Sequence, residues 1–282
     1  QGSAFTGKRK RARALMLNVA NKLLGTHMDD DTLIIGTSGR YEFKNKGIDV
    51  FLESLNRLNR DKDLQKNVLA FVNVPGWVGE PREDLQIRLK SKEKFDTPLE
   101  VPFITHWLHN MTHDQVLDML KYLGMGNRPE DKVKVIFVPC YLDGKDGILN
   151  KEYYDLILGE DLSVYPSYYE PWGYTPLESI AFGIPTITTD LAGFGLWAKK
   201  HVTGNNISEG VAVVNRDDFN YFEVADAITS SILTLAGKDK KEAEEIRKRS
   251  FCLAAKAEWS KFIVYYEEAF RIALEHANKR NN

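Results

Sequence analysis

Six short apolar runs recur along this 282-residue chain, and they constrain its fold more than any other feature. They occupy residues 32–36, 68–75, 133–140, 162–166, 184–190 and 210–214. Two of them, VLAFVNVP and VKVIFVPC, barely alternate between apolar and polar residues, which is typical of strands buried on both faces. Segments with the period of a helix lie between most successive runs. This alternation predicts an α/β fold, a doubly wound parallel sheet of the Rossmann-like type.

The same patterns divide the chain into three parts. We expect a leading helix or linker at residues 1–30, a Rossmann-like domain at 31–220, and carboxyl-terminal helices that pack on it at 221–282. Helical periodicity covers residues 221–235 and 241–278 in the last part. In the first part, the basic run KRKRAR at residues 8–13 precedes an amphipathic pattern. We therefore expect a solvated helix start there rather than a nuclear or phosphate-binding patch.

Composition excludes several classes of partner. The 38 Lys and Arg residues nearly balance the 40 Asp and Glu residues, so neither nucleic acid nor a membrane is expected as a partner. No signal peptide and no membrane-length apolar run is evident, which indicates a cytoplasmic protein. Cys140 and Cys252 have no metal-like spacing, and both are expected to be buried thiols. The chain begins with Gln1 rather than methionine, so we expect the natural protein to be longer.

Basic residues follow the first apolar run, in the segment GRYEFKNKG at residues 39–47. Ligands of parallel α/β sheets bind beyond the carboxyl ends of the strands. Arg40 and Lys46 would lie at that edge, where a guanidinium fork and a compact ammonium suit a diphosphate. Ordinary surface charge is the alternative for both. The order of strand, Gly-Arg and Lys-Gly favours a site for a phosphorylated, nucleotide-like ligand.

A second candidate segment, at residues 165–191, places two carboxylates, Glu170 and Glu178, eight residues apart. Its pattern is that of a strand, a loop, a helix and a further strand. We expect the helix to begin at Thr175 with Pro176 in its first turn. The free N–H groups and the dipole of such a helix start form an anion site. Thr175 and Glu178 also fit a capping box, in which Glu178 is a cap rather than a ligand.

Three histidines, His106, His109 and His113, are spaced by three and four residues. On one continuous helix they would share a face and could bind a metal. However, Thr112 and Gln115 indicate that a new helix is capped there, which would break the shared face. No carboxylate that could orient a histidine is evident, so the sequence favours no metal at this place.

The segments GRYEFKNKGIDVFLESLNRLN (39–59) and YPSYYEPWGYTPLESIAFGIPTITTDLAGFG (165–195) resemble the glycogen synthase family of animals and fungi. The second segment is the more specific, because its two glutamates occur across retaining glycosyltransferases of the two-domain GT-B type. The resemblance implies that most of this chain is the second, nucleotide-sugar-binding domain of such an enzyme. The implied reaction transfers glucose from UDP-glucose, or less favoured ADP-glucose, to the 4-hydroxyl end of an α-1,4-glucan.

The resemblance also assigns catalytic roles. Arg40 and Lys46 match the pair that holds the diphosphate and neutralises the charge of the leaving group, where fixed cations help most. Glu170 matches the carboxylate beside the transferred sugar. No cofactor is implied, and the two cations make a metal unnecessary.

Five further residues would bind the donor. Glu178 matches the second carboxylate of the motif, which is expected on the ribose hydroxyls. The N–H groups of Gly173, Tyr174 and Thr175 would contact sugar or phosphate oxygens. Tyr153 matches by its offset an aromatic residue that stacks on the nucleobase.

The expected partners are the nucleotide sugar, an α-glucan acceptor and the family's first Rossmann-like domain, which this chain lacks. Without that domain the chain is expected to bind the donor but to transfer glucose poorly or not at all; a homo-oligomer is possible. Arg247, Lys248 and Arg249 form the only dense basic group late in the chain, and we expect a solvated helix face rather than a sugar-phosphate sensor. The alternatives are a non-catalytic nucleotide-sugar-binding module, or a retaining transferase with another donor or acceptor.

Overall fold

The computed structural model describes residues 2–280, and the centre of this part is a sheet of six parallel strands in the order β5-β2-β1-β6-β7-β8. The strands are β1 (Leu33–Ser38), β2 (Val68–Asn73), β5 (Val133–Val138), β6 (Leu162–Val164), β7 (Thr186–Thr189) and β8 (Val211–Val214). Every residue of these strands is buried, which agrees with their lack of alternation. The predicted doubly wound parallel sheet is confirmed.

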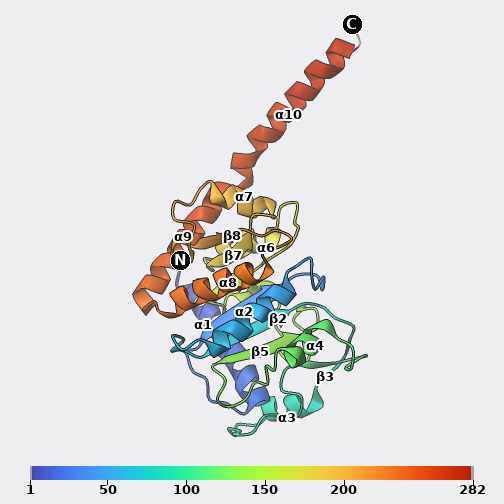
Figure 1. Ribbon diagram of the computed structural model, residues 1–282, viewed down its shortest axis with the longest axis vertical. Coiled ribbons are helices and arrows are strands. Elements are labelled where there is room, and N and C mark those ends of the chain that lie inside the picture. Colours follow the sequence, from blue (N-terminus) through green and yellow to red (C-terminus); the bar gives the residue numbers. More distant parts are fainter. Residues whose placement is uncertain (1, 281–282) are drawn as a thin grey trace.

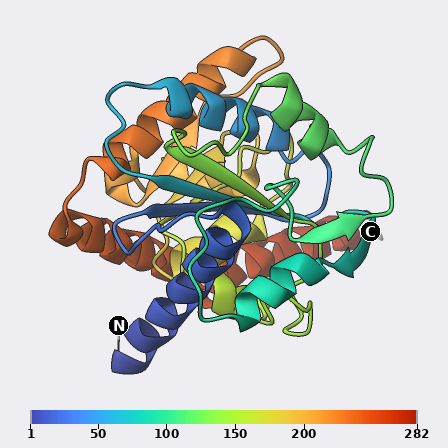
Figure 2. The ribbon, with the colours of Figure 1, turned by 90° about the horizontal axis from the view of Figure 1, so that it is seen from below.

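Helices cover both faces of the sheet, as the view from below shows (Figure 2). One face carries α2 (Ile48–Arg60), α4 (Gln115–Tyr122) and α8 (Tyr221–Ala236). The other carries α1 (Ser3–Leu24), α3 (Glu83–Lys90) and α5 (Tyr153–Ile157). Around β8 pack α6 (Tyr174–Ala181), α7 (Gly193–Lys199) and α9 (Lys240–Ala254). The connection from β2 to β5 leaves the sheet, with β3 (Val78–Pro81) paired antiparallel to β4 (His106–Leu108).

The strand order reverses between β1 and β6. From β1 the chain builds outward through β2 to β5, then returns to place β6 on the other side of β1. In an open α/β sheet, such a reversal leaves a crevice beyond the carboxyl ends of the two strands. The segments that follow β1 and β6, residues 39–47 and 165–174, are the two that the sequence marks as functional.

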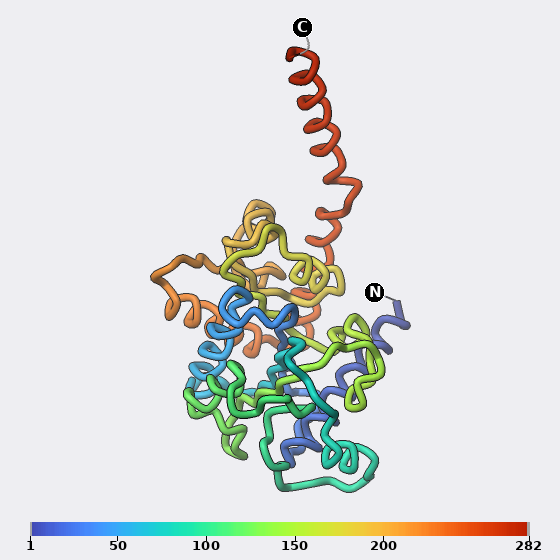
Figure 3. Tube along the Cα trace, turned by 90° about the vertical axis from the view of Figure 1, so that its right-hand side faces the viewer, coloured from blue at the N-terminus to red at the C-terminus, as the bar shows by residue number. Residues whose placement is uncertain are grey.

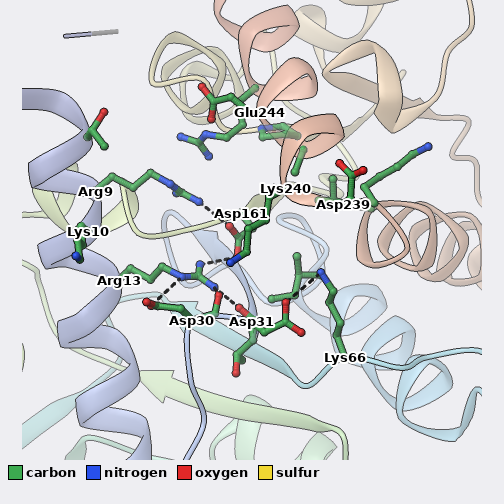
Figure 4. A pocket seen from close by; sticks show the side chains of 18 residues that line it. Arg9, Lys10, Arg13, Asp30, Asp31, Lys66, Asp161, Asp239, Lys240 and Glu244 are labelled. Atoms are coloured by element: carbon green, nitrogen blue, oxygen red, sulfur yellow. Dashed lines mark hydrogen bonds and ion pairs between the residues drawn. The ribbon is translucent and has the colours of Figure 1, made fainter. Parts of the chain in front are cut away.

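Helix α1 is part of the domain rather than a linker, because Met16, Val19 and Leu23 are buried against the sheet. Lys8, Lys10 and Arg11 are exposed, as expected of a solvated helix start, but Arg9 and Arg13 are not. Arg9 and Arg13 both contact the carboxylate of Asp161, at N···O distances of 2.6 and 2.7 Å, and their side chains are 21% and 12% exposed. Figure 4 shows these arginines turned toward Asp161 in a cavity at the amino-terminal edge of the sheet. Its lining comes mainly from α1, from α9 and from segments that precede β1, β2, β6 and β7.

Arg247 of α9 lines the same cavity, so the expectation of a solvated face is wrong for this residue. It is 5% exposed, and its guanidinium donates to the Glu160 carbonyl at 3.3 Å. Burial lowers the pKa of Arg247 to about 9. Lys248 and Arg249 are exposed, as expected. The helical stripe that packs α9 on the domain therefore includes Arg247 and excludes the two residues after it.

The predicted helix at residues 241–278 is two helices. α9 ends at Ala254, and α10 (Trp259–Arg280) begins after a short 3₁₀ turn. α10 has no buried residue and extends away from the sheet (Figures 1 and 3). Only the start of α10 packs on the domain, where the Phe262 ring lies 5.5 Å from the ring of Trp172. The expectation that the carboxyl-terminal helices pack on the domain is therefore wrong for the rest of α10, because periodicity predicts a helix but not its partner. Within residues 2–280, no helix has both the length and the apolar character needed to span a bilayer.

The two cysteines differ from each other. Cys140 is buried, as expected, whereas Cys252 is exposed. The packed stripe of α9 runs through Ile246, Ser250 and Leu253, and Cys252 lies off that stripe. A buried thiol was therefore the wrong expectation for Cys252.

The carboxyl of Glu160 is enclosed just before β6. It is 2% exposed and accepts a hydrogen bond from the Ser163 hydroxyl at 2.7 Å. It lies over Gly36, where a Cβ would collide with it. Burial raises the pKa of Glu160 to about 8. This value exceeds the pKa of Glu160 in the unfolded chain. Between the two pKa values the carboxyl is protonated in the folded state but ionised in the unfolded state, so the folded state loses stability as the pH rises from the lower value to the higher.

We expect the free energy of unfolding to fall between about pH 5 and about pH 8, and Glu160→Gln to flatten this part of the profile. The neutral amide still accepts the bond from Ser163 but has no proton to lose. Urea unfolding at several pH values measures both profiles. An equal pH slope in variant and wild type would show that Glu160 does not titrate in this range.

Replacing the Asp161 carboxylate, which both arginines of α1 share, should be destabilising. Asp161→Asn leaves Arg9 and Arg13 without their anion, and we expect a loss of about 3 kcal/mol. Asp155→Asn is the matched control, since its ion pair with Lys8 is exposed, and we expect a change within about 1 kcal/mol. Urea unfolding at neutral pH compares the two variants. Equal losses would contradict the structural role of Asp161.

Candidate functional site

A cavity of about 470 Å³ opens at the carboxyl edge of the sheet, beyond β1, β2 and β5. The loops after β1 and β5 and the first residues of α5 and α6 surround it. Its lining includes Ser38, Arg40, Tyr41, Tyr141, Tyr153 and Thr175. Tyrosine rings and a guanidinium together suit a flat ring that carries an anionic group.

The segment 39–47 turns sharply from β1 into α2. Gly47 caps α2 with a φ of 68°, the left-handed region that favours glycine, and a Cβ there would collide with the Pro166 carbonyl. The loop is joined to the one after β6 because the Tyr168 N–H donates to the Asn45 carbonyl at 2.7 Å. Arg40 has a side chain that is 76% exposed and pairs with Glu42 at 2.9 Å. It therefore lies at the open side of the cavity.

These two loops bring Lys46 and Glu170 together as an ion pair whose side chains are 16% and 22% exposed. The backbone fixes Glu170, since its N–H donates to the Leu191 carbonyl at 3.3 Å and its carbonyl accepts from the Gly193 N–H at 3.1 Å. A Cβ at Gly193 would collide with the Pro171 carbonyl, so this close approach requires glycine. The carboxylate neutralises the ammonium in the ligand-free chain.

Helix α6 begins at Tyr174, and its N-cap is Gly173 with a φ of 98°. Thr175 is therefore the second helical residue rather than the cap, and the capping-box alternative is wrong. The Glu178 carboxylate instead accepts a hydrogen bond from the Tyr154 hydroxyl at 2.9 Å. A glycine cap has no side chain to bond the first-turn N–H groups, so these groups and the positive helix end are available to an anion. Thr175 lines the cavity, which places this end beside it.

Tyr153 is the first residue of α5 and lines the cavity. Its hydroxyl oxygen lies 2.6 Å from the Ser38 hydroxyl, which ties the ring to the end of β1. Tyr174 differs, because its ring is 72% exposed and lines an apolar groove with Trp172 and Trp259 instead. The ring of Tyr174 therefore lies outside the cavity.

The lining residues that the sequence prediction missed include Tyr41, Asn73 and Tyr141. The Tyr41 hydroxyl donates to the Asp114 carboxylate at 2.8 Å, which holds that ring, whereas Tyr141 is 76% exposed. Asn73 ends β2 and is 5% exposed. The signal for Tyr141 was available, since it follows an apolar run whose carboxyl end lies at the ligand edge, whereas Asn73 lies within the run at residues 68–75.

A potential set of metal ligands, His106, Cys140 and Asp146, meets near this edge within 4.8 Å. His106 lies on β4, so the three histidines share no helix face, as expected, although α4 is capped by Asp114 rather than Thr112. The ring nitrogens of His106 lie 2.9 Å from the Thr105 hydroxyl and 2.7 Å from the Asp146 carbonyl. The Asp146 carboxylate accepts from three backbone N–H groups, those of Ile148, Leu149 and Asn150. Through these hydrogen bonds the cluster holds the loop after β5 in place.

The arrangement has two chemical poles. The α6 start, Arg40 and Lys46 form a cationic pole, and the tyrosine-lined cavity forms an apolar one. Glu170 adds one carboxylate to the cationic pole. An anion placed at the α6 start would compete with Glu170 for Lys46, because both would be negatively charged partners of one ammonium.

The chain is similar to known proteins over most of its length. The model of the glycogen synthase family matches residues 22–81 and 82–281. A glycogen [starch] synthase of Caenorhabditis elegans is 31% identical, over 88% of this chain and 45% of its own length. The liver glycogen [starch] synthase of Homo sapiens is 30% identical, over 89% of this chain and 43% of its own length. The chain thus spans less than half the length of these relatives.

A solved structure shares the fold. The crystal structure of Anabaena Alr3699/HepE in complex with UDP matches with a TM-score of 0.50 at 14% identity, over 95% of this chain and 52% of that chain. This likeness concerns the fold alone. The family model, by contrast, covers nearly the whole chain, including both loops that meet at the strand reversal. The chain belongs to the glycogen synthase family.

Proposed function

We propose that this chain is the donor-binding domain of a retaining glycosyltransferase that transfers glucose from UDP-glucose to the 4-hydroxyl end of an α-1,4-glucan. One observation carries the proposal: Lys46, Glu170 and the glycine-capped start of α6 meet beside a tyrosine-lined cavity. The family supports the substrate class, since both relatives named above are glycogen [starch] synthases.

The cationic pole binds the diphosphate and stabilises its departure. Negative charge grows on the leaving phosphate as the glycosidic bond breaks, and groups fixed before the reaction stabilise this charge without reorganisation. The N–H groups of Gly173, Tyr174 and Thr175 are held by the helix. Lys46 is held by its loop, and the exposed Arg40 closes on the ligand from the open side. Two cations and a helix dipole leave no requirement for a divalent metal, and no other cofactor is part of the proposal.

Glu170 acts on the sugar after it has released Lys46. When the ammonium turns to the diphosphate, the carboxylate loses its partner and faces the glucose that is being transferred. It then stabilises positive charge at the anomeric carbon. Glu178, already a hydrogen-bond acceptor for Tyr154, binds the ribose hydroxyls. Tyr153 stacks on the nucleobase.

The acceptor site and the other wall of the cleft belong to a second Rossmann-like domain, which the greater length of the relatives accommodates. The partners we propose are therefore this domain, the nucleotide sugar and an α-glucan, in the cytoplasm. A pure binding module is the competing proposal. It would need the cations but not Glu170, whose backbone is fixed on both sides.

Calorimetry with UDP and with ADP tests the donor site. We expect Arg40→Ala to weaken binding of UDP about tenfold, the effect of losing one charge-assisted contact. Arg128→Ala is the matched control, since Arg128 is also exposed but precedes β5, at the opposite edge of the sheet. Wild type that binds neither nucleotide would remove the proposed function, and equal losses in both variants would remove Arg40 from the site.

Glu170→Gln should bind UDP at least as tightly as wild type. The substitution removes the anion that competes for Lys46, while a neutral amide of nearly the same size preserves the packing. The same calorimetry measures this effect. A tenfold or greater loss of affinity would assign Glu170 a structural role instead of a chemical one.

A further inference from the structure

One side chain in the cavity lacks hydrogen-bond partners. Both amide atoms of Asn73, Oδ1 and Nδ2, are buried and unpaired. Among the described residues that line the cavity, no other has a buried side-chain atom in this state. Its cross-strand neighbour Ser38 is different, since the Ser38 hydroxyl is engaged with Tyr153. Asn73 thus lines the cavity at the ends of the central strands, with its unpaired amide atoms buried beneath the surface.

An unpaired buried amide is unfavourable. Each unsatisfied polar group lowers stability by about 1–3 kcal/mol, and most buried polar groups are paired for this reason. An apolar residue would fit the run VLAFVNVP at no such penalty. A polar group without a partner at a ligand edge is explained if a bound molecule supplies the partner.

The chemistry of the amide limits what this partner can be. Asn offers a donor and an acceptor side by side. Phosphate oxygens only accept, and the cationic pole already provides for them. A nucleobase edge presents a donor next to an acceptor: N3–H beside a carbonyl in uracil, and the amino group beside a ring nitrogen in adenine. The tyrosines around Asn73 indicate the same flat ligand.

We propose that Asn73 is a specificity-determining residue that hydrogen-bonds the edge of the donor's nucleobase, an inference that rests on the proposed function of this site. Neither amide atom is exposed in the ligand-free chain. A rotation of the Asn73 side chain therefore accompanies binding.

Calorimetry on the whole chain with UDP, ADP and inorganic pyrophosphate tests this role. Asn73→Leu removes the amide at similar volume, and we expect about tenfold weaker binding of the preferred nucleotide, with a smaller difference between UDP and ADP. Pyrophosphate, which has no base, should bind as to wild type. Thr188→Val is the matched control, because the Thr188 hydroxyl is also buried and unpaired but lies on β7, outside the cavity.

The outcomes distinguish failure of the proposed function from failure of the role of Asn73. If wild type binds no nucleotide, both the proposed function and the role of Asn73 are wrong. If wild type binds, but Asn73→Leu keeps its affinities and base preference, the role of Asn73 alone is wrong. Loss of pyrophosphate binding together with a lower melting temperature would show a structural role and also overturn it. Asn73→Ala, which cannot clash, repeats the comparison should the leucine variant fold poorly.

Discussion

The close contact between Gly47 and the Pro166 carbonyl is the constraint on which the site depends. It lets the loop after β1 lie directly on the loop after β6, where any side chain at position 47 would push them apart. The backbone bond from Tyr168 to Asn45 forms across the same junction. Lys46, the residue before Gly47, is thereby placed against Glu170. A parallel sheet supplies the crevice, but the absence of one Cβ allows its two sides to meet.

Cationic side chains pair with a carboxylate at both edges of the sheet, but the two sets of ion pairs have different roles. At the amino edge, Arg9 and Arg13 share Asp161, which also accepts the N–H of Ile34. That carboxylate has a structural role, because its ion pairs hold α1 against the rest of the domain. At the carboxyl edge, the carboxylate of Glu170 belongs to a loop beside a helix start that no side chain caps. In the proposed function, an incoming anion replaces Glu170 as the partner of Lys46.

Much of the fold was predictable, because parallel strands that are buried on both faces are visible in the sequence as apolar runs. The ligand edge followed from the order of strands and helices, and with it the neighbourhood of Arg40, Lys46 and Glu170. The pairing of Lys46 with Glu170 did not follow, since it depends on two loops separated by 124 residues. The cap of α6 was missed for a related reason: Thr175 and Glu178 satisfy the local pattern, yet tertiary packing starts the helix at Gly173. Asn73 was hidden within an apolar run, where only the structure reveals that its amide has no partner.

The most direct measurement is a crystal structure of this chain with UDP. We expect the diphosphate at the start of α6, Lys46 turned from Glu170 toward it, and the uracil in the cavity with Tyr153 and Asn73. UDP bound in the basic cavity at the amino edge, or bound at the carboxyl edge with the Lys46–Glu170 pair intact, would contradict the exchange of partners on which the proposed function depends.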